Sequence, residues 1–254
     1  MTWVGWEREK LVWRQAKQTD PSSPLMVFGT GSPESDVEWG QKVLGTDIHM
    51  PVFADPVIAG LATTFAGLHP YCDGSVFEGI LTAIIGQSIS VAAAAVTQAK
   101  LAALFPNRVE VGQHTMSPLP SAHQLADSSR ELVRQSGVTM RRAEAIVVAA
   151  NEAVMGNLPT DEWVRSYPDD AVRELLKLPL VGKWTAESIV LWGVGAPDAH
   201  PSGDVALLRA ARQVYERPEM TLKDLDTLAE QWRPARGLAA RLLWTELFGP
   251  ASPT

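Results

Sequence analysis

A short turn between two helical stretches, Leu178 to Gly182 in the sequence LPLVG, constrains the fold more than any other segment. Pro179 ends the first helix, because proline has no N–H to donate and its ring clashes with the preceding turn. Gly182 is expected to supply a backbone conformation that other residues resist, and the second helix is expected to begin near Trp184. The pattern predicts a helix–hairpin–helix whose backbone N–H groups face outward, where they can hold a phosphate. The alternative interpretation is an ordinary pair of antiparallel helices joined by a turn.

Asp204 follows Trp184 by twenty positions and stands at the start of the next expected helix. Aspartate is a common N-cap, and a helix N-terminus keeps its carboxylate ionised at neutral pH. An ionised carboxylate also stabilises the oxocarbenium character that a sugar develops when its glycosidic bond breaks. The two roles are compatible at Asp204, and Asp198 is the other aspartate nearby.

The rest of the chain divides near residue 50. Residues 51–248 contain repeated helix-start signals, at Asp55-Pro56, at Ser75 and at Ser121, and the segment 106–120 is expected to be a surface loop. Residues 1–50 hold four of the nine tryptophans and three runs with β character, KLVWRQ, LMVFGT and VEWGQKVLG. The sequence therefore predicts a mostly α fold, with a small β-rich element over 1–50 packed on a helical domain over 51–254.

Composition limits the classes of function. The chain has one cysteine, Cys72, and five scattered histidines. These residues cannot bind an iron–sulfur cluster or form a zinc site of cysteines or histidines, so no metal site built from side chains is expected. No apolar run approaches 18 residues and the first residues lack a secretory pattern, so we expect a cytoplasmic protein with no membrane contact. The net charge of −7 argues against a general nucleic-acid binder, although a small basic face and backbone N–H groups can still hold a few phosphates.

Four blocks together resemble the helix–hairpin–helix DNA glycosylase superfamily, and within it the AlkA-type DNA-3-methyladenine glycosylases. The blocks span roughly residues 51–248 and read FEGILTAIIGQSISVAAAA, MRRAEAIVVAANEAVMG, LPLVGKWTAESIVLWG with GDVALLRAAR, and WRPARGLAARLLWTEL. The resemblance implies two helical subdomains with the active-site cleft between them, and a reduced N-terminal β element. It implies hydrolysis of the N-glycosidic bond of alkylated purines such as 3-methyladenine and 7-methylguanine, in base excision repair.

Carried onto this sequence, the resemblance makes Asp204 the catalytic aspartate and assigns roles to further positions. Electron-rich indoles suit a cationic alkylated purine, because stacking and cation–π contact hold it. The implied base pocket contains Trp184, Trp244 and Ser188; Ser188 stands where well-known members have an aromatic residue, which leaves the lesion range open. The implied wedge that replaces the flipped base is Ser88 or Ile89; the alternative is that Ser88 or Ser90 only caps the next helix, around Ala92–Ala95. The hairpin positions expected at the DNA backbone are Leu180, Val181, Gly182, Lys183 and Thr185.

The resemblance also bears on partners and side reactions. Bifunctional relatives place a lysine nucleophile where this chain has Trp184, and Lys183 would point about 100° away on a helix, so no lyase activity is expected. Arg236 matches an arginine at the start of the last helix, with contact to phosphate, contact to the Asp204 loop, or an ordinary ion pair as alternatives. Hairpin carbonyls are expected to be able to hold a monovalent cation, and no cofactor is expected. The expected partner is double-stranded DNA with alkylated bases, bound by a monomer that is nucleoid-associated while it acts on DNA.

Two alternatives to this reading have distinct signatures. One is a helix–hairpin–helix glycosylase for another damaged base; the missing lysine and the missing cysteines argue against the oxidised-guanine and cluster-bearing adenine classes. The other is a non-catalytic DNA-binding module that uses only the hairpin, against which the spacing of Asp204 argues.

Overall fold

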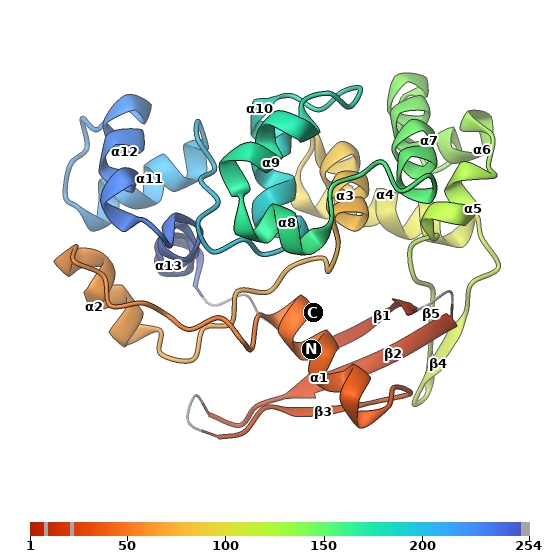
Figure 1. Cartoon of the computed structure of the whole chain (residues 1–254), viewed down its shortest axis with the longest axis horizontal. Coiled ribbons are helices and arrows are strands. Elements are labelled where there is room, and N and C mark those ends of the chain that lie inside the picture. Colours follow the sequence, from red (N-terminus) through yellow and green to blue (C-terminus); the bar gives the residue numbers. More distant parts are fainter. Residues whose placement is uncertain (8–9, 21–22, 250–254) are drawn as a thin grey trace.

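The computed structural model describes residues 1–7, 10–20 and 23–249, and helices make up most of them (Figure 1). The strands are β1 (Thr2–Glu7), β2 (Lys10–Lys17), β3 (Met26–Gly29), β4 (Val109–Val111) and β5 (His114–Met116). The helices of the first half are α1 (Pro33–Leu44), α2 (Pro56–Thr64), α3 (Val76–Gly86), α4 (Val91–Ala103), α5 (Ala122–Ala126), α6 (Arg130–Arg134) and α7 (Met140–Val154). Those of the second half are α8 (Asp161–Ser166), α9 (Pro168–Leu175), α10 (Lys183–Ser188), the π-helix η1 (Ile189–Gly193), α11 (Val205–Val214), α12 (Leu222–Ala229), the 3-10 helix η2 (Glu230–Trp232) and α13 (Arg236–Phe248).

The chain opens with a three-stranded antiparallel sheet in the order β1–β2–β3, followed by α1. The expectation of β character for VEWGQKVLG was wrong, because this segment lies in α1. Ser32 and Ser35 form a capping box, in which each hydroxyl accepts the backbone N–H of the other residue, and Pro33 occupies the first turn. These start signals lie just before the Val and Trp that suggested a strand, and they favour a helix whose Trp39 then packs near Trp3 of the sheet.

A second small sheet corrects the expectation that residues 106–120 form only a loop. β4 and β5 pair as an antiparallel hairpin across a turn in which Gly112 has φ +63°. The hairpin lies beside the N-terminal sheet (Figure 1), and just after it the carbonyl of Leu119 accepts the indole N–H of Trp6 at 2.8 Å. Three-residue strands are too short to give a clear periodicity in the sequence, so contact with the sheet decides their conformation.

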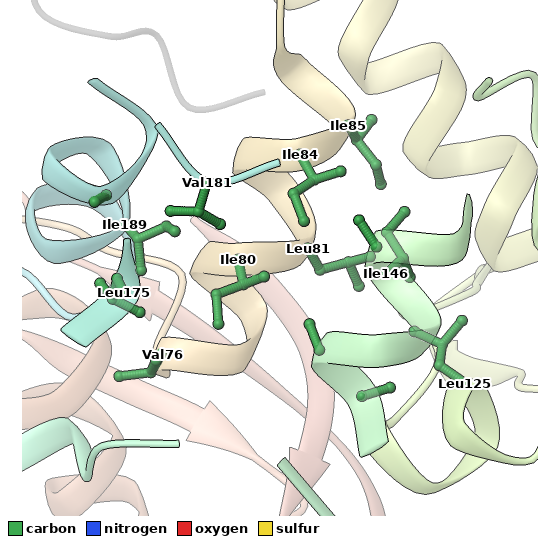
Figure 2. Close-up of a cluster of buried hydrophobic side chains, with 14 of the residues drawn as sticks. Val76, Ile80, Leu81, Ile84, Ile85, Leu125, Ile146, Leu175, Val181 and Ile189 are labelled. Atoms are coloured by element: carbon green, nitrogen blue, oxygen red, sulfur yellow. The ribbon is translucent and has the colours of Figure 1, made fainter. Parts of the chain in front are cut away.

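The largest hydrophobic core surrounds α3, whose apolar residues are buried on several sides. In Figure 2, Val181 and Ile189 of the hairpin region lie on one side of α3, near Ile80, and Ile146 of α7 lies on the other side, near Leu81. A helix that is apolar around most of its circumference is stable only inside a core, as the segment FEGILTAIIG predicts. The hairpin α9–α10 is therefore built onto α3.

A separate core joins α2 to α11, α12 and α13, so the C-terminal helices pack on a helix from the first quarter of the chain (Figure 1). Fully buried members include Ile58 of α2, Leu207 of α11 and Trp232 of η2. Trp244 of α13 packs against both this core and the core around α3. The hairpin and α11 therefore belong to different clusters, and the loop between Gly193 and Asp204 connects them.

The expected helix starts are confirmed where they were named. Asp55 accepts the backbone N–H groups of Val57 and Ile58, and the hydroxyls of Ser75 and Ser121 cap α3 and α5. Within the described residues, no single helix is long and apolar enough to cross a membrane. Helices α3 and α4 have the required length and apolarity only when taken together, and the pair is bent by 118°.

Candidate functional site

The hairpin forms where the sequence predicts it, but its strained residue is a different one. After α9 the chain turns through Leu176–Gly182, and Val181 donates its N–H to the carbonyl of Leu178 at 3.3 Å. The assignment of the unusual backbone conformation to Gly182 was wrong: Gly182 has φ −87° and ψ 176°, and Leu180 has φ +62°. A left-handed leucine costs on the order of 1 kcal/mol, and its side chain offsets that cost by packing on the core around α3.

The second hairpin helix continues from α10 into the π-helix η1 and packs very closely on α3. A Cβ atom added to Gly79 would lie 2.6 Å from the Cα of Gly193, and one added to Gly193 would lie 2.9 Å from the Cα of Gly79. Side chains at either position would separate the two helices. The close approach fixes the hairpin against the central helix, and it positions everything that α10 carries.

Asp204 is the N-cap of α11, as expected. Its Oδ1 accepts the backbone N–H of Leu207 at 2.7 Å, and its own N–H donates to the carbonyl of Pro201 at 3.2 Å. No hydrogen bond to its second oxygen, Oδ2, is formed within the described part of the chain, and the residue is half-buried. The carboxylate is thus held through one oxygen at a helix N-terminus.

Asp198, the competitor of Asp204, is occupied by arginines. Arg236 is buried, and its Nε donates to Asp198 Oδ1 at 3.0 Å; Arg233 Nη1 reaches Asp198 Oδ2 at 2.6 Å. Arg236 also pairs with Asp169 at 3.0 Å and Glu230 at 3.1 Å. Of the alternatives for Arg236, the structure shows the ion pair: the guanidinium joins a network of carboxylates that includes Asp198, in the loop leading to Asp204.

The three predicted pocket residues differ in exposure. Trp184 is 45% exposed, far from the buried state expected of a core tryptophan, and Trp244 is partly buried. Ser188 is buried, and its hydroxyl donates to the carbonyl of Trp184 at 2.8 Å. The serine hydroxyl is therefore committed to the backbone of its own helix.

Sequence reasoning missed two residues near Trp244, namely Trp192, which contacts it, and Arg241, which contacts Trp192. Trp192 of η1 stacks on Trp244 with ring centroids 5.3 Å apart and an interplanar angle of 29°. The guanidinium of Arg241 lies 4.2 Å from the Trp192 ring centre and donates to the carbonyl of Leu191. Burial lowers the pKa of Arg241 to about 10, so it is still a cation at neutral pH. An arginine within the apolar run LAARLLW was the available sequence signal.

The predicted wedge residues lie in an exposed loop between α3 and α4. Ser88 has φ +57°, and Ile89 is 39% exposed. Ser90 caps α4 by accepting the N–H of Ala93, so the capping role belongs to Ser90 and not to Ser88. Both candidate wedge residues are therefore available at the tip of the loop.

Gln87, at the base of this loop, connects it to the hairpin. Its Nε2 donates to the carbonyl of Leu180 at 2.8 Å and to the hydroxyl of Thr185 at 3.2 Å. Thr185 is thus a buried residue that supports the loop, whereas Lys183 is 69% exposed and its Nζ lies 3.6 Å from Glu187. The carbonyl of Leu180 already accepts a hydrogen bond from Gln87. Binding of a monovalent cation by the hairpin carbonyls remains a prediction.

Comparison with curated proteins gives relatives at moderate identity over most of the chain, and no protein-family model matches it. The chain is 30% identical over 202 residues to the DNA-3-methyladenine glycosylase 2 of Escherichia coli K12, covering 79% of this chain and 68% of that protein. It is 31% identical over 180 residues to a Mycobacterium tuberculosis protein named probable bifunctional transcriptional activator/DNA repair enzyme AlkA. That match covers 69% of this chain and only about a third, 34%, of the mycobacterial protein.

Solved structures show the same architecture. A 3-methyladenine DNA-glycosylase from Archaeoglobus fulgidus superimposes with a TM-score of 0.80 at 25% identity, covering 97% of this chain and 88% of that one. The 8-oxoguanine glycosylase/lyase of Clostridium acetobutylicum, in complex with double-stranded DNA, gives a TM-score of 0.75 at 17% identity over 96% of this chain and 84% of its own. The second likeness is one of fold alone, so the fold does not distinguish the two lesion classes.

Proposed function

Because this chain belongs to the helix–hairpin–helix DNA glycosylases of the AlkA, DNA-3-methyladenine glycosylase type, we propose that it removes alkylated purines from DNA by hydrolysis of the N-glycosidic bond. The chain would act in base excision repair on double-stranded DNA that contains 3-methyladenine or 7-methylguanine. The observation that carries the proposal is Asp204, a half-buried carboxylate held through one oxygen at the N-terminus of α11 and with the other oxygen unbonded within the described residues.

The carboxylate supplies electrostatic stabilisation where charge develops. Cleavage of the glycosidic bond leaves positive charge on the sugar, and a fixed anion beside it lowers the energy of that transition state. The bond from Leu207 N–H orients Asp204 before the substrate arrives, so little reorganisation is needed. The alkylated purine, which alkylation had made cationic, leaves as a neutral base with the electron pair of the glycosidic bond. Water then adds to the sugar cation and releases one proton to the solvent.

The aromatic residues supply recognition of the flipped base. Trp184 exposes nearly half of its surface at the start of α10, and Trp244 is backed by Trp192. An indole face attracts an electron-poor, cationic purine by stacking and cation–π contact, worth about 0.5–2 kcal/mol. These interactions favour a damaged base over an ordinary one without a hydrogen bond that reads one particular lesion.

The hairpin and the loop at Ser88–Ile89 are the elements proposed to hold DNA. The net charge of −7 gives no general attraction to phosphate, so backbone N–H groups of the hairpin supply the contact. Gln87 links the loop to the hairpin, which lets one element grip the backbone while the other fills the gap left by the base. Binding by these uncharged donors is expected to be weak and to change little with salt, because few phosphates are neutralised by lysine or arginine and few counterions are released.

We further propose that the enzyme is monofunctional. A Schiff base needs an unprotonated amine beside the sugar, and the position expected for that lysine holds Trp184. The neighbouring Lys183 is directed toward Glu187, at 3.6 Å. Treatment with borohydride during turnover on alkylated DNA is expected to trap no covalent protein–DNA complex.

Mass spectrometry of bases released from methylated DNA tests the proposal. Wild-type protein is expected to release 3-methyladenine and 7-methylguanine, and Asp204→Asn is expected to lower the rate at least a hundredfold, because the neutral amide cannot stabilise the sugar cation. Asparagine caps helices as well as aspartate, so the variant keeps its fold and its affinity for DNA. Binding of alkylated DNA by the wild type without any base release would instead identify a non-catalytic binding module.

A further inference from the structure

Glu187 of α10 is an acidic side chain buried within the hairpin helix. Its Oε1 accepts the hydroxyl of Ser202 at 2.6 Å, and Lys183 Nζ lies 3.6 Å from the same oxygen. Its Oε2 is buried and has no hydrogen-bond partner among the described residues. A buried carboxylate with one oxygen unmatched costs free energy, so this position is a poor choice for stability alone.

The partner of Glu187 lies in the loop that carries Asp204. Other residues of this loop are attached to the C-terminal helices: the carbonyl of Pro197 accepts the N–H of Gly237 at 2.8 Å, Asp198 binds Arg236, and His200 Nε2 lies 2.8 Å from Asp226 Oδ1. Ser202 instead bonds to the hairpin helix, two residues before the carboxylate. The contact between Glu187 and Ser202 therefore relates the position of Asp204 directly to the hairpin.

Packing alone does not hold this part of the loop. A cavity of about 320 Å³ lies between the hairpin helix and α12, and its walls include Glu187, His200, Ser202 and Asp226. Gly203, between Ser202 and Asp204, has φ +74° and no atom within 4 Å of the position that a Cβ would take. A loop with a cavity beneath it and an unpacked glycine depends on its few polar contacts for its position.

We propose that Glu187 is a positioning residue of the glycosylase reaction, which acts by holding Ser202, and through it Asp204, at a fixed place relative to the hairpin. The inference rests on the proposed function of Asp204. A hairpin seated on the DNA backbone would then also set where the carboxylate meets the sugar. Small displacements of a reacting group cost large factors in rate, so the contact affects the chemical step more than DNA binding.

The proposal has a consequence for pH dependence. Burial raises the pKa of Glu187, while the Ser202 hydroxyl and the Lys183 ammonium lower it and Asp226 raises it. The other charged or titratable groups that face the same cavity are Asp169, His200, Glu230 and Arg236. As the pH falls through the raised pKa, the carboxylate becomes neutral, and its charge-assisted bond to Ser202 weakens to an ordinary hydrogen bond. The rate of base release should fall with it, at a higher pH than an ordinary glutamate titrates.

Single-turnover kinetics on alkylated DNA across pH test the proposal. Glu187→Gln and Ser202→Ala are each expected to lower the rate constant roughly ten- to hundredfold at neutral pH, with the Kd for DNA within about twofold of wild type. The double variant should be no slower than Ser202→Ala alone, because Ser202→Ala removes the same contact that Glu187→Gln weakens to a neutral hydrogen bond. The acid limb of the profile that belongs to Glu187 should disappear in all three. Ser202→Thr keeps the hydroxyl and should restore most of the rate.

Hydrogen exchange of the backbone amides in the loop 200–206 gives a readout that does not depend on catalysis. Both Glu187→Gln and Ser202→Ala should accelerate exchange there, with circular dichroism and Tm showing that the fold is kept. Glu144→Gln, an exposed glutamate of α7 paired with Arg130, is the matched control and should change neither rate nor exchange.

The outcomes separate this proposal from the proposed function. An active wild type with Glu187→Gln and Ser202→Ala at full rate and unchanged exchange would overturn the positioning role and leave the glycosylase function standing. A wild type that releases no base would contradict the glycosylase function, and exchange in the loop would then decide whether Glu187 holds it. A third outcome is that Glu187→Gln and Ser202→Ala both lose Tm and DNA affinity, while the rate constant of Ser202→Ala shows no specific fall. This outcome would show a structural role only and would also overturn the proposal.

Discussion

The side-chain amide of Gln87 donates to the main-chain carbonyl of Leu180 at 2.8 Å, across 93 residues of sequence. One residue lies at the base of the exposed loop that follows α3, and the other has the left-handed conformation in the hairpin. The same amide reaches the Thr185 hydroxyl, and the carbonyl of Gln87 accepts the guanidinium of Arg142. The element proposed to enter the DNA and the element proposed to bind its backbone are thus linked as one unit.

Removal of this link should affect base flipping more than folding. Gln87→Ala leaves the Leu180 carbonyl without its donor and is expected to lower the free energy of unfolding by about 1–2 kcal/mol. The loop would then be free to move relative to the hairpin, so flipping should weaken several-fold. Fluorescence of 2-aminopurine placed next to the lesion measures the flipping, and urea unfolding measures the stability. Gln135→Ala, at an exposed C-cap position, is the control and should alter neither.

The tryptophan at the start of α10 should matter for recognition and not for stability. Because Trp184 is 45% exposed, Trp184→Ala is expected to change the free energy of unfolding by less than about 1 kcal/mol. Loss of its stacking and cation–π contact should lower kcat/KM for 7-methylguanine release roughly threefold to thirtyfold. Phe28→Ala removes an aromatic side chain of similar exposure on β3 and should leave the kinetics unchanged. A Trp184→Ala enzyme with wild-type kinetics would remove this residue from the base pocket.

Arg236 should be a structural residue with a pH signature. Arg236→Met leaves Asp198 short of a buried partner, and the free energy of unfolding is expected to fall by about 3 kcal/mol or more at pH 7. Burial acts to raise the pKa of Asp169, but the guanidiniums of Arg236 and Arg233 outweigh it and lower that pKa. A lowered carboxyl pKa stabilises the fold above the pKa of the unfolded chain, and this contribution is lost as the pH falls through the folded value.

The difference in the free energy of unfolding between wild type and Arg236→Met should therefore become smaller below about pH 4, the range in which aspartate titrates in unfolded chains. Urea unfolding at pH 7 and pH 3 measures it. The control is Arg173→Met, which breaks the exposed pair with Asp170 and should cost less than about 0.5 kcal/mol. Equal losses for the two arginines would contradict the role assigned to Arg236.

The contribution of Glu78 of α3 to stability should depend on pH in the direction opposite to that of the Arg236 and Asp169 pair. Burial raises its pKa to about 7, against the ordinary value of 4.5. A raised carboxyl pKa means that the folded state keeps the proton, so the stabilisation is complete below pH 4.5 and is lost as the pH rises through 7. Glu78→Gln should therefore be more stable than wild type at pH 8, by at most about 3 kcal/mol, with little difference at pH 4. Thermal unfolding across pH checks this, with the exposed Glu174→Gln as a control that shows no such trend.

The sequence by itself determined the features whose signals lie within a few residues of one another. Capping residues start α2, α3 and α5 where they were expected, because an N-cap and the N–H groups that it satisfies are at most three residues apart. Pro179 with its neighbours marked the hairpin, and Asp204 was recognisable as the cap of the helix that follows. The order and spacing of the four blocks then identified the fold and the family.

Only the tertiary structure decided which groups from distant segments meet. It placed the left-handed conformation at Leu180 and not at Gly182, because the leucine side chain packs on the core while its carbonyl receives Gln87. It paired Trp192 with Trp244 and buried Arg236 among three carboxylates, and it gave Glu187 a partner in Ser202. The physical reason is that these contacts gain their energy from desolvation and geometry that exist only once α3, the hairpin and the C-terminal helices have packed together.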